Sequence, residues 1–233
     1  EISGTRVYNK PIHRGAMLES YHDGTQEVVG TTRCDDCQWD RSGEWVNVLT
    51  PTWDTVNGKI TLNQKEEGIF TKDRFGDGYI SYRVKFGADL SASRMSLKFC
   101  SVEQNFSEIG VTTYYLHTTS DGKMNFYKII SGVLTELGHV IATVAINTEY
   151  KIEVLKAGST IKVYIDGVLK ATVADTSLTS GYIGFGCWEG SIEYRDIQII
   201  AAPPDATNGI AACIPPIGGG ARYGVEESVY IPI

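Results

Sequence analysis

The stretch SEIGVTTYY, Ser107 to Tyr115, offers a glutamate in an alternating pattern typical of a β-strand. Such a strand would place Glu108, Gly110 and Thr112 on one face and leave Ile109 and Val111 for the core. Retaining hydrolysis of a glycosidic bond needs two carboxyl groups about 5 to 5.5 Å apart. Glycine and threonine cannot transfer the proton, so the pattern predicts that this strand does not hydrolyse a sugar through a carboxylate pair.

Other catalytic patterns are weak. Glu66 and Glu67 are adjacent, so on a strand they would face opposite sides and could not share a substrate. The sequence contains neither the GxSxG nucleophile elbow nor a glycine-rich phosphate loop. Most acidic residues are expected to be solvated surface groups. A catalytic group assembled in three dimensions remains an open alternative.

Five cysteines are present, an odd number. Cys34 and Cys37 form the motif CDDC, which would be half of a zinc ribbon, but no second half follows. Disulfides or plain loop thiols are therefore favoured over a metal, with the pairing left open. The disulfide candidates are Cys34, Cys37, Cys100, Cys187 and Cys213.

The 233 residues carry a net charge of -7 with acidic and basic groups well mixed, which argues against a nucleic-acid-binding surface. No apolar run approaches the roughly 20 residues that span a bilayer. The sequence begins at Glu1 without a methionine, so we expect a processed chain or a fragment. Together with the suspected disulfides, this favours an extracellular or particle-surface location.

Alternating strands separated by turns recur through the middle of the chain. YISYRVKF places Ile80, Tyr82, Val84 and Phe86 on one face, and RMSLKF, YKIEV and IKVYI repeat the pattern. Turn signals such as Asn57-Gly58, Asp121-Gly122 and Asp166-Gly167 lie between the strands. The fold class predicted is all-β, an antiparallel two-sheet sandwich.

Composition divides the chain into three zones. Residues 1–50 are irregular and polar and hold the CDDC loop, residues 51–200 hold the regular strands, and residues 201–233 are rich in Pro, Gly and Ala. The last zone is interpreted as a linker or an extended arm.

Two segments of the middle zone resemble the concanavalin A-like lectin and glucanase superfamily, also called laminin-G-like jelly rolls. They are WDTVNGKITLNQKEEGIFTKDRFGDGYISYRVKF and YKIEVLKAGSTIKVYIDGVLKATVADTSLTSGYIGFGCWEGSIEYRDIQI. The closest pattern is that of the 3-keto-disaccharide hydrolase-type domains. The resemblance implies a jelly-roll sandwich and leaves the activity open, because such folds host many functions. Laminarinase-type relatives carry Glu-x-Asp-x-Glu where this chain has Glu108 to Thr112.

A non-catalytic sugar-binding face is the first functional hypothesis. Sugars are recognised by flat aromatic rings and by planar hydrogen-bonding groups. The candidate ligand-binding residues are Glu108, Thr112, Tyr114, His117, Asn125, Tyr127 and Trp188. The expected partner is a glycan or a cell-surface polysaccharide, and a glycan-processing hydrolase is the third alternative.

Two further expectations concern a structural calcium ion and self-association. The resemblance implies a structural Ca²⁺ near Asp196 in the closing segment YRDIQI. The second functional hypothesis is a structural subunit of a virion or an extracellular filament, which self-associates when residues 201–233 add to a neighbour's sheet edge. A flexible tether is the alternative for the same residues.

Overall fold

The computed structural model describes residues 33–35 and 42–201. These residues form strands and two short 3₁₀ helices, η1 (Ser42–Glu44) and η2 (Leu90–Ala92), and this part of the chain contains no α-helix. No helix among these residues could span a membrane. The strands are β1 (Arg33–Asp35), β2 (Trp45–Val48), β3 (Thr52–Asp54), β4 (Lys59–Leu62), β5 (Glu67–Thr71), β6 (Gly78–Phe86), β7 (Ser93–Ser101), β8 (Thr113–Thr118), β9 (Lys123–Ile130), β10 (Val133–Thr143), β11 (Glu149–Ala157), β12 (Thr160–Ile165), β13 (Val168–Ala174), β14 (Tyr182–Gly190) and β15 (Ile192–Ala201).

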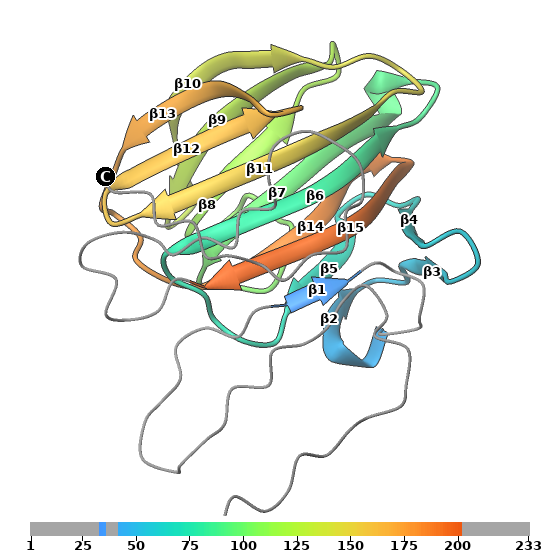
Figure 1. Cartoon of the computed structure of the whole chain (residues 1–233), viewed down its shortest axis with the longest axis horizontal. Helices are drawn as coiled ribbons and strands as arrows, with labels where there is room; N and C mark the ends of the chain where they lie inside the picture. Colours follow the sequence, from blue (N-terminus) through green and yellow to red (C-terminus); the bar gives the residue numbers. More distant parts are fainter. Residues whose placement is uncertain (1–32, 36–41, 202–233) are drawn as a thin grey trace, which may run out of the picture.

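Two antiparallel sheets pack face to face (Figure 1). Sheet A has the order β13-β12-β11-β6-β15-β4-β3, with β1 also paired to β15. Sheet B has the order β10-β9-β8-β7-β14-β5-β2. The predicted two-sheet jelly-roll sandwich is therefore confirmed.

Alternation along the strands builds the core between the sheets. Ile80, Tyr82, Val84 and Phe86 of β6 are all buried, as the sequence pattern predicts. From sheet B, Phe185 meets Tyr82 edge to face with ring centroids 5.1 Å apart. Each fully buried side chain of this kind stabilises the fold by about 1.5 to 3 kcal/mol.

Tight turns fix the register of neighbouring strands. Asp166 and Gly167 both have positive φ, 49° and 74°, between β12 and β13. This is the backbone of a two-residue hairpin turn, which Asp-Gly favours. The Asp121-Gly122 signal likewise lies between β8 and β9.

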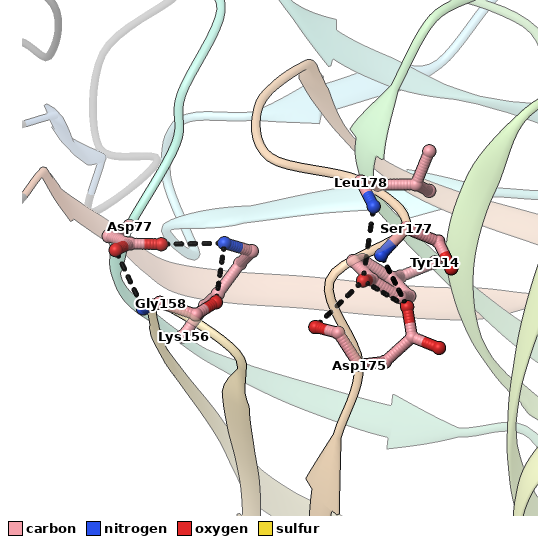
Figure 2. A network of polar contacts seen from close by, with 7 residues as sticks. All are labelled: Asp77, Tyr114, Lys156, Gly158, Asp175, Ser177 and Leu178. Atoms are coloured by element: carbon pink, nitrogen blue, oxygen red, sulfur yellow. Dashed lines mark hydrogen bonds and ion pairs between the residues drawn. The ribbon is translucent and has the colours of Figure 1, made fainter.

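One end of the sandwich is closed by polar contacts (Figure 2). The hydroxyl of Tyr114 donates to the Asp175 carboxylate at 2.7 Å and accepts from the backbone of Leu178 at 3.3 Å. Nearby, the Lys156 ammonium donates to Asp77 at 2.6 Å. Burial acts to raise the pKa of Asp175, but hydrogen bonds from Lys128 and Tyr114 outweigh it and the pKa is lowered. Asp175 and Lys156 therefore each have a partner of opposite charge at the margin of the core.

The predicted strand over Ser107–Tyr115 is wrong in its first part. Residues 102–112 form an irregular loop, and β8 begins at Thr113. Ile109, expected in the core, is 89% exposed at this loop. Val111 is buried as expected, although it packs with Tyr115 and Ile129 in a small cluster outside the main core.

The zones predicted at the two ends of the chain are described only in part. Trp45–Val48 and Arg33–Asp35 form strands, so the irregular N-terminal zone is shorter than expected. The CDDC loop beyond Asp35 and the arm after Ala201 lie outside the described residues.

Candidate functional site

Strand register places one straight row of residues across the outer face of sheet B. Asn125 of β9 pairs with His117 of β8, and His117 pairs with Ser96 of β7. Ser96 then pairs with Gly186 of β14, and Gly186 with Gly68 of β5. We call these five residues the outer row. Asn125, His117 and Ser96, from β9, β8 and β7, have polar side chains, and we call them the polar half of the outer row. Gly186 and Gly68, from β14 and β5, form its glycine half.

The polar half of the outer row is joined by hydrogen bonds. The hydroxyl of Tyr115, next to His117 on the same face of β8, lies 3.0 Å from Ser96 Oγ and 3.1 Å from His117 Nδ1. The rings of Tyr115 and His117 are stacked, with centroids 5.2 Å apart. Asn125 Oδ1 accepts a hydrogen bond from the Val140 amide at 2.7 Å, which orients that side chain. The imidazole is therefore held in a defined position.

Electrostatics keep His117 neutral. Burial first, and the nearby Arg94 guanidinium second, lower the pKa of His117 to about 4. Arg94 forms an ion pair with Glu189, whose side chain is half exposed. Arg94 Nε is buried without a hydrogen-bond partner among the described residues. At neutral pH this face thus presents a neutral imidazole beside a cation and a carboxylate.

Loop 102–112 covers the two glycines of the outer row. The ring of Phe106 lies directly on the glycine half of the outer row, because a Cβ placed on Gly186 would come within 2.2 Å of it and one on Gly68 within 2.4 Å. Phe106 also packs on Phe70, with ring centroids 4.7 Å apart. The glycines therefore provide the space that this ring occupies.

The Lys98 side chain holds the loop from below. Its ammonium donates to the carbonyl oxygens of Asn105 at 3.1 Å and Ser107 at 2.5 Å. Burial lowers the pKa of Lys98 to about 8, while the charges of Glu108, Glu66 and Glu103 oppose that shift. Lys98 is fully buried, so its role is to hold the loop in place.

Five of the seven predicted ligand residues lie in three places. His117 and Asn125 belong to the outer row, and Tyr127 lies beside them because it pairs with Tyr115. Glu108 lies on the loop, close enough to act on the pKa of Tyr115. Trp188 lies at the irregularity of β14 between Cys187 and Glu189, with Lys65 Nζ 5.0 Å from its ring centroid.

Two of the predicted residues have other tasks. Tyr114 lies in the core between the sheets and is fully buried, so its expected place on the ligand face is wrong. Thr112 Oγ1 accepts from the Ser131 amide at 3.0 Å and ties the loop to the hairpin of β9 and β10. Alternation fails for both because the loop ends just before Thr113.

Arg94, Ser96 and Lys98 are not among the ligand residues predicted from the sequence. Their signal was present in RMSLKF, since Met95, Leu97 and Phe99 are confirmed as core residues. Alternation then places the other three on the outer face. The pairing with β8 and β14 joins distant segments and leaves no such signal.

The metal and disulfide predictions fall only partly on described residues. No group of three or more His, Cys, Asp or Glu that could hold a metal occurs within 33–35 and 42–201. Asp196 is exposed on sheet A and forms an ion pair with Arg83 at 3.2 Å, and calcium there stays a prediction. Cys100 and Cys187 are free, buried thiols whose pKa burial raises to about 11 and about 12.

The structure describes no side chain for the other three cysteines. Cys34 lies in β1, of which only the backbone is described. Cys37 and Cys213 lie outside the described residues.

The two sheets and their strand order define a jelly-roll sandwich of the concanavalin A-like superfamily, in agreement with the resemblance seen in the sequence. Residues 35–200 match a family described as the 3-keto-alpha-glucoside-1,2-lyase-like domain. The chain belongs to this family. No curated protein matches the sequence.

Solved structures share the fold at low sequence identity. The carbohydrate-binding module CBM66 from Bacillus subtilis has a TM-score of 0.57 at 15% identity, covering 68% of this chain and 96% of its own. The β-glucanase of Bacillus licheniformis has a TM-score of 0.54 at 13% identity, covering 76% and 99%. A lichenase derived from a mouse hindgut metagenome has a TM-score of 0.56 at 12% identity, covering 73% and 99%. The fold is thus one found in both carbohydrate-binding and glycoside-cleaving proteins.

Proposed function

We propose that this domain binds a carbohydrate on the outer face of sheet B, at Arg94, His117 and Glu189, without hydrolysing it. The observation that carries the proposal is the position of Arg94, His117 and Glu189 together on one face of sheet B. The family match and the carbohydrate-binding and glucanase neighbours support a sugar as the ligand class.

The chemistry of these groups suits sugar hydroxyls. A guanidinium donates in a planar fork, a carboxylate accepts, and a neutral imidazole does both. Hydrogen bonds to charged groups contribute about 1.5 to 3 kcal/mol each when the site is partly shielded from water. Trp188 is half-buried and offers a ring against which an apolar sugar face could pack.

The two central strands argue against hydrolysis by a carboxylate pair. The outward positions of β8 are Thr113, Tyr115 and His117. Those of β7 are Arg94, Ser96 and Lys98. None of these side chains is a carboxylate, so neither strand supplies the pair that the mechanism requires.

An elimination reaction is the second candidate, because the family description names a lyase acting on 3-keto-alpha-glucosides. A base would take the proton on C2, next to the C3 ketone, and the C1–O bond would break as the C1=C2 double bond forms. The leaving oxygen would then take up a proton. His117 could serve as the base and Arg94 could stabilise the enolate. A pKa of about 4 makes His117 a weak base at neutral pH, and binding is therefore preferred.

Binding is tested with a glycan array followed by calorimetry on the sugars that are retained. We expect His117→Ala to weaken binding at least tenfold, or about 1.4 kcal/mol. His139→Ala is the matched control, because His139 is an exposed histidine on β10 whose only described ion pair is with Glu136. A blank array, or an equal loss in both variants, would contradict the proposal.

The elimination is tested separately with methyl 3-keto-alpha-glucoside. Release of methanol by the wild type and its loss in His117→Ala would favour the lyase. No release, together with retained sugar binding, would leave recognition as the function.

A further inference from the structure

A polar pocket lies at one end of sheet A, where β6 ends and β11 and β15 begin (Figure 1). Its volume is about 130 Å³. The lining residues are Lys85, Phe86, Gly87, Asn147, Ser191 and Glu193. Phe86 belongs to the core, so the pocket offers a ligand an ammonium, a carboxylate, an amide and a hydroxyl group. Pockets for drug-sized ligands measure about 300 to 1,000 Å³, so this one suits a smaller molecule.

Backbone hydrogen bonds fix the walls of this pocket. The Asn147 amide donates to the Gly87 carbonyl at 3.1 Å, and the Phe86 amide donates to the Thr148 carbonyl at 3.1 Å. Asn147 has a φ of 52°, in the left-handed region that asparagine tolerates better than most residues. On the other side, Ser191 is the single residue that connects β14 to β15. The pocket is therefore preformed, and a ligand does not have to order it.

Lys85 is the charged group that this pocket leaves available. In the strand register it lies between Glu149 of β11 and Glu193 of β15. Other cations hold both carboxylates, since Arg195 Nε lies 3.0 Å from Glu149 and Lys59 Nζ lies 2.5 Å from Glu193. Among the described residues, the half-buried Lys85 ammonium has no ion-pair or hydrogen-bond partner of its own. A partly buried charge gains from a partner of opposite sign, so the pocket favours an anionic ligand.

We infer that this pocket is a second ligand site, which takes a small hydroxylated monocarboxylate of the sugar-acid type. Lys85 binds the carboxylate through a charge-assisted hydrogen bond. Asn147 and Ser191 bind the ring hydroxyls, and the Glu193 carboxylate accepts from one of them. The negative charge of Glu193 disfavours a ligand with two negative charges. The site lies on the opposite sheet from the proposed carbohydrate site and does not depend on it.

Titration of the wild-type protein, followed by nuclear magnetic resonance, tests this site. We expect sodium D-glucuronate to shift the backbone amide signals of Gly87, Asn147 and Ser191 in a saturable way. Glucose lacks the carboxylate, acetate lacks the hydroxyls, and inorganic phosphate carries a second negative charge. Each of these three should bind about tenfold more weakly or worse, which corresponds to losing one charge-assisted hydrogen bond.

Two results of this titration would overturn the inference. One is the absence of a saturable shift with glucuronate, and the other is equal affinity for glucose, acetate or phosphate. Shifts confined to the face around His117 would also overturn the second site, while supporting the proposed function.

A variant then tests the residue itself. Lys85→Ala should weaken glucuronate binding about tenfold or more and leave the weak binding of glucose unchanged. Lys162→Ala is the matched control and should keep the wild-type affinity. Lys162 is also half-buried on the outer face of sheet A, between the core residues Ile161 and Val163, and it does not line the pocket. An equal loss in both variants, or no loss in Lys85→Ala, would overturn the assignment. Should circular dichroism show that Lys85→Ala is unfolded, the comparison of the four probes in the wild type still decides.

Discussion

His117 is the residue through which fold and site are most closely linked. The same burial that packs its ring against Tyr115 also keeps it uncharged, and Arg94 acts in the same direction. Such a group can donate or accept a hydrogen bond without demanding a counter-ion. Its protonation state is therefore part of the site's chemistry as well as of the protein's stability.

The depressed pKa of His117 makes stability depend on pH. Because about 4 lies below the ordinary value of 6.5, the unfolded chain takes up a proton between these values and the native protein does not. The contribution of His117 is thus fully present above pH 6.5 and is lost as pH falls towards 4, by about 3 kcal/mol at most.

Urea unfolding between pH 4 and 7 measures this effect. His117→Gln lacks the titrating group, so we expect the difference in free energy of unfolding between wild type and variant to change by up to that amount across the range. A difference that stays constant with pH would show that His117 titrates normally.

At the scale of elements, the fit between loop 102–112 and sheet B depends on two strands having no side chain at the contact. A methyl group on Gly186 would lie 2.2 Å from Phe106, which a packed ring cannot accommodate without moving. Overpacking of this kind costs about 1 to 3 kcal/mol. We expect Gly186→Ala to lose that much stability in urea unfolding.

Gly43→Ala provides the comparison for this substitution. A Cβ on Gly43 would have no atom within 4 Å, so its stability should stay within about 0.5 kcal/mol of the wild type. Equal stability of the Gly186→Ala and Gly43→Ala proteins would mean that Phe106 does not press on the sheet.

The sequence predicts elements best where one face of a strand is buried and a turn follows. The β6, β7 and β12 patterns are confirmed because alternation there reports burial directly. Even the pairing of His117 with Asn125 follows from a hairpin centred on Asp121. The prediction of a strand over Ser107–Tyr115 is wrong in its first part because Val111 is buried for another reason: it anchors loop 102–112.

The rest of the site depends on pairing between distant segments. Neither the contact of Ser96 with β8 and β14 nor the placement of Phe106 on the glycines has a local pattern. Register between strands that are far apart in sequence is set by the whole core. This is why Glu108 seemed central in the sequence, whereas Arg94 and Ser96 are the residues that flank His117.

At the scale of the whole molecule, both sheets end in edge strands within the described residues, among them β10 and β2 of sheet B and β13 and β3 of sheet A. β10 is 11 residues long and exposes Val133 and Leu134. Such an edge can pair with an added strand. We propose that residues 201–233 mediate self-association by pairing with such an edge of a neighbouring copy.

Light scattering after size exclusion tests the role of the arm. We expect the full chain to form oligomers and a variant ending at Ala201 to be a monomer. Cutting there removes no described strand, so the sandwich should keep its far-ultraviolet spectrum. A monomer in both proteins would contradict assembly through the arm and favour a tether.

The pairing of a bare glycine strip with a single covering ring has a consequence for how this domain could diverge. The strip has no side chains of its own, so what covers this part of the sheet is determined by an eleven-residue surface segment, 102–112, and not by the sheet. Surface loops accept substitution and changes in length far more readily than paired strands do. Relatives could therefore keep the same sheet and change the surface above it by exchanging that one segment, with the scaffold unchanged.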